Sequence, residues 1–531
     1  MNPNRSLKEM VRNCPGIVAP IPPLSDRSIT GVEFDSRKVE TGSIFVAIEG
    51  EYYDGHTFIE NALKKGAALI VGTQERYLNE IPEKYLQVED ARIALAYLSA
   101  AFYDFPARKM TIIGVTGTDG KTTTTNLIYH ILKSAGIKAG MVSTVNAVVG
   151  DEDIDTGFHV TTPEAPMVQE LLARMVQAGL THVVLETTSH GLDQHRVAAC
   201  EYDIGVITNV THEHLDYHKT YENYVKTKGR LFTMLPETEE KPIGNIRLGV
   251  LNRDDRSYPL LKDMVDRLDE ERIHCITYSR IGTADVSVLR EEQTRQGLLL
   301  DLLLDLQVAG QEMEISSGLV GAYNVSNILA AVAAAAIGLN IDLTTIRQAV
   351  ASFPGIPGRM EKIDMGQNFT AIVDFAHTPN ALQVTLETAR QLTDNKVIVV
   401  FGSAGLRDRE KRKIMAAEGV RLADMCILTA EDPRTEKLED ILGEMSRAAQ
   451  AVGGVLEKDL FVVPDRGSAI RKALQIAEKG DLVIVCGKGH EQSMCFETTE
   501  YPWDDRVAMK AALAELQGVA GPAMPYLPTQ D

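Results

Sequence analysis

The chain has 531 residues, of which 44% are apolar and 24% charged, and its formal net charge is −20 because 74 Asp and Glu outnumber 54 Lys and Arg. This length exceeds what one ordinary hydrophobic core supports and predicts about three domains. The acidic balance argues against a nucleic-acid partner and against binding to an anionic membrane surface, since both need a basic face.

Three further features bear on where the protein works. Residues 1–20 contain no continuous apolar segment of the signal-peptide type. The longest apolar run, residues 329–339, is about half as long as a bilayer span requires. Six cysteines are scattered without a CxxC pair, which is typical of reduced thiols and not of a disulfide frame or a zinc site. We therefore expect a cytoplasmic protein that does not insert into a membrane.

The first predicted domain covers residues 1–107 and is small and mixed. Short strand-like runs at 43–48 and 68–71 are separated by turn residues. The second predicted domain covers residues 108–351 and opens with the apolar strand at 110–115.

Strand and helix patterns alternate through the second domain. Strand-like runs follow at 181–186 and 204–210, and the run at 298–308 is expected to be a small antiparallel insert.

The third predicted domain covers residues 352–531 and begins with the break FPGIPGR. Helical stretches separate its strand-like runs, which are 370–374, 396–402, 425–429, 460–464 and 482–487. Strands alternating with helices of this length imply parallel sheets with right-handed crossovers. The expected fold class is α/β, with a small mixed domain, a central P-loop parallel-sheet domain and a C-terminal Rossmann-like domain.

The strongest local signal is GVTGTDGKTTTT, which follows a strand and opens a helix. Gly117 and Gly120 allow the backbone to bend so that consecutive N–H groups point toward an anion. Lys121 is expected to reach the β- and γ-phosphates of ATP, and the Thr122 hydroxyl to bind Mg²⁺. The fit to GxxxxGK[ST] is imperfect because Val115 stands where the first Gly belongs. An ordinary Gly-rich turn is the alternative.

Magnesium needs further oxygen ligands, and Glu186 ends the predicted strand HVVLE at the sheet edge that faces a nucleotide. An acid at a strand end is by itself more often a surface cap. Four of the twelve histidines lie close together at positions 190, 195, 212 and 214. Zinc is the competing interpretation, but no cysteines cluster here. We favour His214 as a partner of Mg²⁺ or of an acyl phosphate.

Eleven segments, of which this loop is the second, occur in a fixed order. They are DSRKV (35–39) with the following GSIFVAIEGEYYDGHTFI, GTDGKTTTT, TTPEA, ETTSHGLDQHR, NVTHEHLDYH, YVKTKGRLF, GAYNVSNILAA, GRME, VDFAHTPNAL, DPRTE and GKGHE. Together they resemble the Mur ligase family, and within it the branch of UDP-N-acetylmuramoyl-tripeptide synthetases. The resemblance runs from about residue 30 to residue 506.

The resemblance implies an ATP-dependent ligation. The D-Glu γ-carboxylate of UDP-MurNAc-L-Ala-D-Glu attacks the γ-phosphate of ATP, and the α-amine of a free diamino acid then attacks the acyl phosphate. Such chemistry depends on positioning and charge neutralisation, which makes Lys121 and Mg²⁺ more important than any protein nucleophile. The family further implies a monomer that works in peptidoglycan precursor synthesis.

The resemblance also assigns residues around the phosphates. Thr122, Glu186 and His214 match positions that bind Mg²⁺, and Lys228 matches the family's carbamylated lysine, whose carbamate binds Mg²⁺ as a carboxylate does. A solvated helical lysine would be the default without the family. The implied ATP contacts are Gly117, Thr118, Asp119, Gly120, Lys121, Thr122, Thr123, Asn324, Arg359 and Asp374. Because the last two belong to the third domain, the family implies an interdomain site that closes to exclude water.

Other matches imply the two remaining substrates. The UDP-MurNAc-dipeptide contacts are Ser36, Thr161, Thr162, Ser189, Gln194 and Arg196. Thr161-Thr162-Pro163 also reads as a helix cap. The contacts of the incoming amino acid are Arg407, Asp432, Arg434, Gly487 and Glu491.

The identity of that amino acid rests on a departure from the family pattern. Arg434 is retained, which favours a distal carboxylate and therefore meso-diaminopimelate. Asp432 replaces the usual Asn, and this acid could instead favour the ammonium of L-lysine or L-ornithine. FGSAGLRDREKR also departs from the usual FGCGGDRD, although Arg407 still matches. We favour meso-diaminopimelate.

Three other functions compete with this one. A folylpolyglutamate- or cyanophycin-type ligase would share the P-loop, but DSRKV, DPRTE and GKGHE count against it. A P-loop kinase or transport ATPase is disfavoured by the Val115 departure and the whole third block. A scaffold without activity is disfavoured because Lys121, Thr122, Glu186, His214 and Lys228 are all present.

Overall fold

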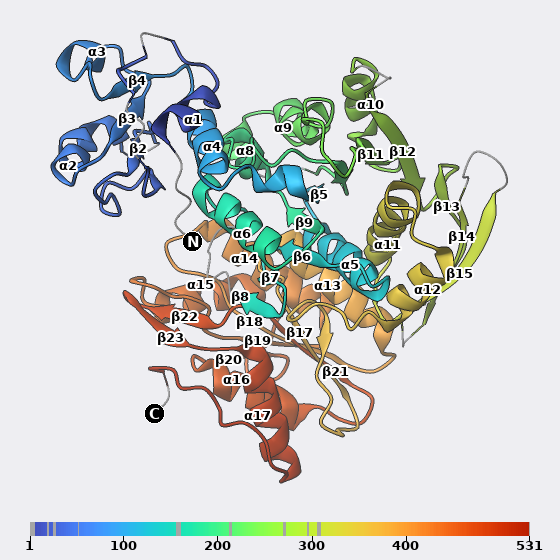
Figure 1. Cartoon of the computed structure of the whole chain (residues 1–531). Helices are drawn as coiled ribbons and strands as arrows, with labels where there is room; N and C mark the ends of the chain where they lie inside the picture. Colours follow the sequence, from blue (N-terminus) through green and yellow to red (C-terminus); the bar gives the residue numbers. More distant parts are fainter. Residues whose placement is uncertain are drawn as a thin grey trace. The chain divides into compact units, whose positions relative to one another are not determined.

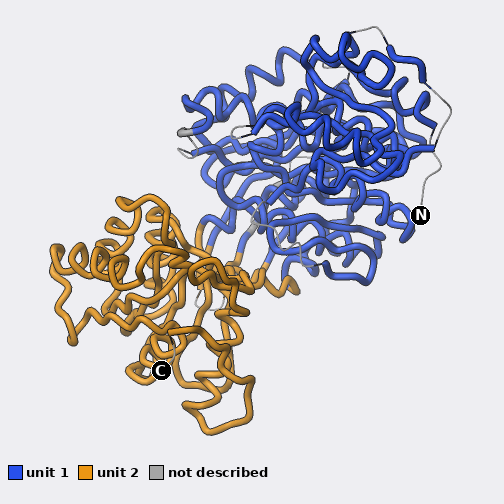
Figure 2. The backbone as a smooth tube through the Cα atoms, turned by 90° about the vertical axis from the view of Figure 1, so that its left-hand side faces the viewer, with its two compact units in different colours: residues 1–291, 300–315, 323–351 blue, residues 292–299, 316–322, 352–531 orange. Residues whose placement is uncertain are grey.

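The computed structural model describes residues 6–18, 21–24, 28–50, 53–154, 161–211, 215–268, 272–294, 297–304 and 310–529. The chain divides into two compact units (Figure 2). Unit 1 comprises residues 1–291, 300–315 and 323–351, and unit 2 comprises residues 292–299, 316–322 and 352–531.

The N-terminal part of unit 1 is built on a four-stranded parallel sheet in the order β1-β2-β3-β4. Successive residues of one strand point to opposite faces, so Val46 packs in one cluster with Leu98, and Phe45 packs on the other face with Ala62. The elements are α1 Leu7–Arg12, β1 Val32–Glu33, β2 Ile44–Val46, a 3₁₀ turn Gly55–Phe58, α2 Ile59–Lys64, β3 Leu69–Gly72, α3 Tyr77–Glu80, β4 Tyr85–Gln87 and α4 Ala91–Phe102.

The central sheet has the order β15-β14-β13-β12-β11-β10-β5-β9-β6-β7-β8. Its strands β11, β10, β5, β9 and β6 run parallel. The strands are β5 Thr111–Thr116, β6 Ala139–Val142, β7 Ala147–Val149, β8 Glu152–Ile154, β9 His182–Glu186, β10 Ile204–Ile207, β11 Leu248–Asn252, β12 His274–Ser279, β13 Val286–Thr294, β14 Gly297–Leu304 and β15 Gln311–Ser317.

The helices of this region follow the strands in the chain (Figure 1). They are a 3₁₀ turn Pro106–Lys109, α5 Lys121–Ser134, α6 Ala165–Gln177, α7 Ser189–Asp193, α8 Leu215–His218, α9 Tyr221–Thr233, α10 Tyr258–Asp266, α11 Tyr323–Ala333, a π-helical turn Ala334–Gly338 and α12 Leu343–Ser352. In the part of the chain that the structure describes, every helix is too short or too polar to cross a bilayer.

Unit 2 contains a six-stranded sheet in the order β16-β17-β21-β18-β19-β20, parallel except for the short edge strand β16. Val399 packs with residues of α13, α14 and α15, while Ile398 packs with residues of α16 and α17, so helices cover both faces. The elements are β16 Glu361–Lys362, β17 Thr370–Asp374, α13 Pro379–Leu392, β18 Val397–Phe401, α14 Arg409–Leu422, β19 Met425–Leu428, α15 Leu438–Ala451, β20 Leu460–Val462, α16 Arg466–Ile476, β21 Leu482–Cys486, β22 Ser493–Phe496, β23 Thr499–Pro502 and α17 Asp505–Gln517.

These sheets confirm the predicted α/β class. The five strands expected in the third block are β17 to β21, and the strands expected at 110–115, 181–186 and 204–210 are β5, β9 and β10. The strand expected over 298–308 is β14 as far as Leu304, and residues 305–309 lie outside the described part of the chain. The three predicted domain boundaries remain a prediction.

A fully buried arginine joins two strand ends of unit 2. Arg466 Nε and Nη2 donate to the two carboxylate oxygens of Asp505 at 2.8 and 2.7 Å. Its Nη1 donates to the carbonyl of Ala430 at 3.0 Å, and Nη2 also donates to the carbonyl of Cys486 at 2.8 Å. Trp503 Nε1 donates to Asp505 at 2.8 Å. The guanidinium therefore fixes the ends of β19 and β21 against each other.

Replacing Arg466 with Met should lower the free energy of unfolding of unit 2 by about 3–5 kcal/mol, because the carboxylate of Asp505 would stay buried without its partner. The single tryptophan of the chain, Trp503, reports this region, so urea unfolding followed by tryptophan fluorescence measures the effect. Arg471→Ala is the matched control, since Arg471 pairs with Glu515 on the surface between the same two helices. It should cost less than about 1 kcal/mol, and equal effects of the two changes would contradict the assignment.

Candidate active site

The predicted phosphate loop connects β5 to α5 and is held by the end of β10. The backbone N–H of Thr118 donates to the carbonyl of Asn209 at 2.8 Å, and the N–H of Asp119 donates to Asn209 Oδ1 at 2.9 Å. Thr208 Oγ1 donates to the carbonyl of Asp119 at 2.6 Å. A fixed loop at the N-terminus of a long helix is the arrangement that binds phosphate.

Both glycines of the loop are required by close contacts. Gly117 has φ +155°, and a Cβ there would lie 1.8 Å from Thr208 Oγ1. Gly120 has φ +80°, and a Cβ there would lie 2.1 Å from Asn327 Oδ1. Asn327 Nδ2 donates at 2.9 Å to Asn324, one of the predicted ATP contacts. The structure therefore places Asn324 on α11 beside the start of α5.

Lys121 and Thr122 open α5, as the sequence predicts. Lys121 Nζ donates to the carbonyl of Thr118 at 2.8 Å, so this side chain folds over its own loop. Thr123, the third residue of the helix, is half-buried. Asp119 is exposed at the tip of the loop.

Glu186 ends β9 and is completely buried. Thr122 Oγ1 donates to its Oε1 at 2.9 Å. Thr144, in the connection after β6, donates to the same carboxylate through its backbone N–H and through its hydroxyl, each at 2.9 Å. The Thr144 hydroxyl also lies 3.2 Å from that of Thr161. Thr122 and Glu186, the predicted ligands of Mg²⁺, are thus in direct contact. Thr161 is connected to Glu186 through the hydroxyl of Thr144.

Lys228 reaches the phosphate loop from helix α9. It is 1% exposed, and its Nζ donates to the carbonyl of Gly117 at 2.5 Å. The ammonium also lies 4.6 Å from the ring centroid of Tyr224, one helical turn earlier. The Tyr224 hydroxyl is 3.3 Å from the hydroxyl of Thr118. His214, the other predicted metal ligand on this side, lies outside the described residues.

Several predicted substrate contacts form one network behind Glu186. Thr162 Oγ1 donates to the backbone carbonyl of Glu186 at 3.2 Å and accepts from the N–H of Thr188 at 2.9 Å. Arg196 Nη1 donates to the carbonyl of Thr162 at 2.8 Å, and its Nη2 donates to Gln194 at 2.7 Å.

The other two predicted substrate contacts have partners of their own. Ser189 begins α7, and its hydroxyl lies 3.1 Å from His218 Nε2. Ser36 belongs to the N-terminal sheet region, where it is buried and accepts from Asn61 Nδ2 at 3.4 Å.

In unit 2, the predicted nucleotide contacts Arg359 and Asp374 lie near each other in the chain segments around β17. The guanidinium of Arg359 lies 4.4 Å from the ring centroid of Phe375. Asp374 accepts from the N–H groups of Met360 and Ala376 at 2.7 and 2.9 Å and from Thr385 Oγ1 at 3.0 Å. A carboxylate has about four acceptor sites, so these bonds leave capacity for a ribose hydroxyl.

The loop with Asp432 and Arg434 and the loop with Gly487 and Glu491 carry four of the predicted amino-acid contacts, and they meet at Lys488. Lys488 Nζ lies 3.0 Å from the carboxylate of Asp432 and 2.5 Å from that of Glu491. A Cβ on Gly487, whose φ is +116°, would lie 2.3 Å from Glu431 Oε2. Burial raises the pKa of Glu431 to about 7.

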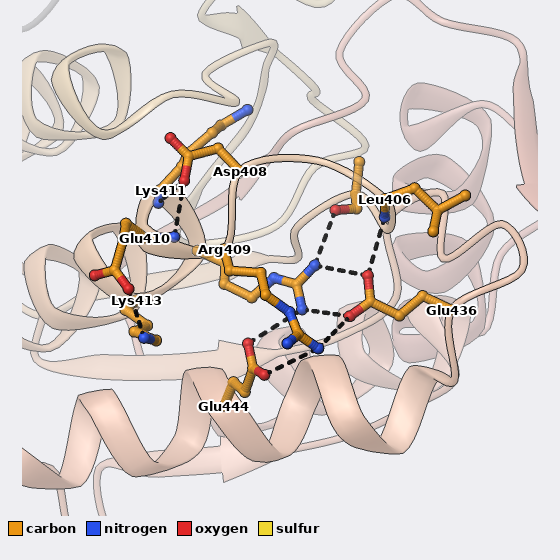
Figure 3. Close-up of polar contacts among 10 residues, drawn as sticks. Leu406, Asp408, Arg409, Glu410, Lys411, Lys413, Glu436 and Glu444 are labelled. Atoms are coloured by element: carbon orange, nitrogen blue, oxygen red, sulfur yellow. Dashed lines mark hydrogen bonds and ion pairs between the residues drawn. The ribbon is translucent and has the colours of Figure 1, made fainter.

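The carboxylate of Glu436 links the loop that carries Arg407 to the loop that carries Arg434. Figure 3 shows Glu436 with its donor Leu406. Glu436, two residues after Arg434, accepts the backbone N–H of Leu406 at 2.9 Å, one residue before Arg407. Arg412 donates to both oxygens of Glu436 at 2.8 and 2.9 Å and lies 3.2 Å from Glu444. Arg407 itself is exposed.

Comparison with known proteins identifies this architecture. Three family models match the chain: "Mur ligase family, catalytic domain" over residues 28–103, "Mur ligase middle domain" over 115–335 and "Mur ligase, glutamate ligase domain" over 358–489. A UDP-N-acetylmuramyl-tripeptide synthetase of Roseiflexus sp. (strain RS-1) is 41% identical over 502 residues, which cover 94% of this chain and 97% of that protein. The chain belongs to the Mur ligase family.

Other Mur ligases match over a similar extent. A UDP-N-acetylmuramoyl-L-alanyl-D-glutamate–2,6-diaminopimelate ligase of Geobacillus thermodenitrificans (strain NG80-2) is 40% identical over 92% of this chain and 95% of its own length. A solved structure of a ligase with the same name has a TM-score of 0.69 at 29% identity, covering 97% of this chain and 100% of that one. The family predicted from the motif order is confirmed.

Several residues of this Mur ligase site were missed by the sequence analysis. Tyr224 lies at position i−4 from Lys228 on α9, a spacing that could have suggested their contact. Thr208 and Asn209 lie within the strand predicted over 204–210, beyond the observed end of β10 at Ile207, and could also have been suspected. The contacts of Thr144 with Glu186 and of Lys488 with Asp432 carry no such signal, because 42 and 56 positions separate these partners in the sequence.

The residues present fit a magnesium ion. Mg²⁺ binds through one or two protein oxygens and keeps several waters, and the Thr122 hydroxyl and the Glu186 carboxylate offer such a pair. Within the described ranges no group of three or more His, Cys, Asp or Glu side chains forms a dedicated metal cage. An ion held by this pair would share the neutralisation of the ATP phosphates.

The link between Glu436 and Arg412 should make stability depend on pH. Hydrogen bonding to Arg412 holds the pKa of Glu436 at about 2, below its ordinary value of 4.5. The link therefore stabilises the folded state fully above pH 4.5 and is lost as the pH falls toward 2. The stability difference between wild type and Glu436→Gln should be largest at neutral pH and shrink below pH 4.5, as measured by Trp503 fluorescence.

Glu439→Gln, which changes an exposed carboxylate of α15, is the control. A difference that is constant with pH would contradict the link.

Proposed function

We propose that the chain ligates a diamino acid to the D-Glu γ-carboxylate of UDP-MurNAc-L-Ala-D-Glu, at the expense of ATP. The arrangement of Lys121, Thr122, Glu186 and Lys228 around one loop supports this proposal most strongly, because a single triphosphate bound there would lie beside all four. Sequence identity of 36–41% to proteins named as tripeptide synthetases or 2,6-diaminopimelate ligases supports it further. The reaction belongs to peptidoglycan precursor synthesis. We propose that the protein carries it out in the cytoplasm, as a monomer.

The chain's own residues would act mainly by placing charge. Loop N–H groups and Lys121 hold the β- and γ-phosphates while the substrate carboxylate attacks the γ-phosphorus and ADP leaves. The neutral amine of the second substrate then attacks the acyl carbon. The C–O bond to phosphate breaks, inorganic phosphate leaves with that electron pair, and the nitrogen loses one proton to the phosphate or to water. Thr161, Thr162, Ser189, Gln194 and Arg196 would hold the acceptor substrate, and Ser36 its uridine. Thr118, Asp119, Thr123, Asn324, Arg359 and Asp374 would complete the ATP site.

We further propose that the three regions 1–107, 108–351 and 352–531 divide these tasks. The first would bind the uridine end, the second ATP, and the third the incoming amino acid through Arg407, Asp432, Arg434, Gly487 and Glu491. We propose meso-diaminopimelate as that amino acid, because Arg434 can hold a distal carboxylate in a bidentate manner. L-Lysine or L-ornithine is the second candidate, since Asp432 adds a negative charge to the pocket.

Phosphate release should require all three substrates if the protein is a ligase. ATP, UDP-MurNAc-dipeptide and meso-diaminopimelate together should give steady release, and lysine or ornithine a slower one. Lys121→Ala should lower the rate about a hundredfold or more, because the phosphates lose their cation. Lys133→Ala, at the far end of the same helix, is the control. Release that does not depend on the amino acid would indicate a plain ATPase, and a clear preference for lysine would overturn only the choice of amino acid.

Lys228 is proposed to carry a carbamate, with His214 as its neighbour at the metal. A carbamate keeps one N–H, which can still donate to the carbonyl of Gly117. Protein equilibrated with ¹³C-bicarbonate should show a carbamate signal in ¹³C NMR that disappears in Lys228→Arg, along with most of the ligase activity. A fully active Lys228→Arg enzyme, or a signal that persists in it, would rule the modification out. Lys241→Arg is the matched control, since Lys241 is also buried but pairs with Asp203.

A further inference from the structure

Lys488 is a buried lysine to which the proposed reaction gives no task. It follows β21 between Gly487 and Gly489, and 2% of the residue is exposed. Burying an ammonium is costly unless it is paired, so its surroundings explain why it can remain there. Those surroundings consist of two carboxylates that are both proposed to contact the incoming amino acid.

The contacts of Lys488 are short and direct. Its Nζ lies 3.1 and 3.0 Å from the two oxygens of Asp432 and 2.5 Å from Glu491. The lysine side chain is 3% exposed, whereas Asp432 is 21% and Glu491 38% exposed. The ammonium therefore lies behind the two carboxylates, which keep surface for a ligand.

The charge of this cluster follows from its members. Burial lowers the pKa of Lys488, but Glu491 and Asp432 outweigh burial, so the pKa is raised and the ammonium stays charged. One ammonium against two carboxylates leaves one net negative charge. Glu431, behind Gly487, adds only part of a charge at neutral pH because its pKa is about 7.

We propose that Lys488 is a specificity-determining residue. Its ammonium cancels one of the two negative charges of Asp432 and Glu491. The pocket then suits a substrate whose distal group bears both an ammonium and a carboxylate. This inference rests on the proposed function. The remaining negative charge matches one ammonium, and Arg434 supplies the positive charge for the carboxylate. Without Lys488 the two negative charges of Asp432 and Glu491 would face only the positive charge of Arg434. The pocket would then favour a purely cationic side chain such as that of L-lysine.

The structure also explains how Asp432 can replace an amide here. Its Oδ1 accepts from the backbone N–H of Cys495 at 2.9 Å as well as from Lys488. An Asn would keep this acceptor and so preserve the contact to β22. Asp432→Asn therefore removes one charge while leaving the loop anchored, and it provides the counterpart to removing Lys488.

The test compares the substrate preference of wild type with that of two single variants, each lacking one charge, and of the double variant. The measured quantity is kcat/KM for L-lysine divided by kcat/KM for meso-diaminopimelate. Lys488→Met should raise this ratio about tenfold, since it uncovers one negative charge near the distal group. Asp432→Asn should lower the ratio, because L-lysine loses its partner while diaminopimelate keeps Arg434. The double variant restores the net charge and should return the ratio close to that of wild type.

Controls separate this inference from the proposed function and from misfolding. Lys396→Met removes a lysine of the same unit that pairs with Glu478, and it should leave the ratio unchanged. A wild-type protein that ligates neither amino acid would refute the proposed function. A wild-type ligase whose ratio stays constant, or moves in one direction in both single variants, would refute only the role of Lys488. If Lys488→Met unfolds, as shown by Trp503 fluorescence, Asp432→Asn and the double variant still decide the sign.

Discussion

The proposed amino-acid pocket depends on the buried pair of Arg466 and Asp505. The guanidinium donates to the carboxylate of Asp505 and to the carbonyls of Ala430 and Cys486. Ala430 lies just beyond β19, and Cys486 is the last residue of β21. Asp432 follows Ala430 by two residues, and Lys488 follows Cys486 by two residues. Because Arg466 holds Ala430 and Cys486 in place, it also helps to bring Asp432 and Lys488 to within 3.0 Å of each other. A salt bridge of this kind costs desolvation, and here it fixes geometry at the sheet edge where ligands bind in α/β folds.

Buried polar groups also fix the geometry of the predicted phosphate loop in unit 1. The phosphate loop is held by Thr208 and Asn209 from β10, and Lys228 approaches its carbonyl from α9. Glu186 is completely buried, yet Thr122 and Thr144 satisfy its oxygens. Each of these charged groups is thus held by hydrogen bonds that are already formed, the lysines by backbone carbonyls and Glu186 by threonine donors. Such preorganised charge is what transfer of a phosphoryl group requires.

Much of the fold and the family was predictable from the sequence, because both follow local signals. Buried parallel strands read as short apolar runs, so β17 and β21 could be placed from their composition, and the strand–GK–helix pattern located Lys121. The pairing of charges was not predictable. From the sequence, Asp432 was interpreted as an acid without a neutralising partner, because Lys488 lies 56 positions away. Thr144 contacts Glu186 because β6 and β9 are neighbours in the sheet, which the sequence does not show. Contacts of this kind are fixed by topology and carry no local pattern.

The link through Glu436 has an evolutionary consequence. One carboxylate accepts from the backbone of the loop that bears Arg407 and from Arg412, while its own backbone belongs to the loop that bears Arg434. A drift of either loop is therefore transmitted to the other, and the pocket cannot be widened on one side alone. A lineage that changes its cell-wall amino acid would accordingly find exchanges of single charges at the pocket wall easier than insertions in the loops.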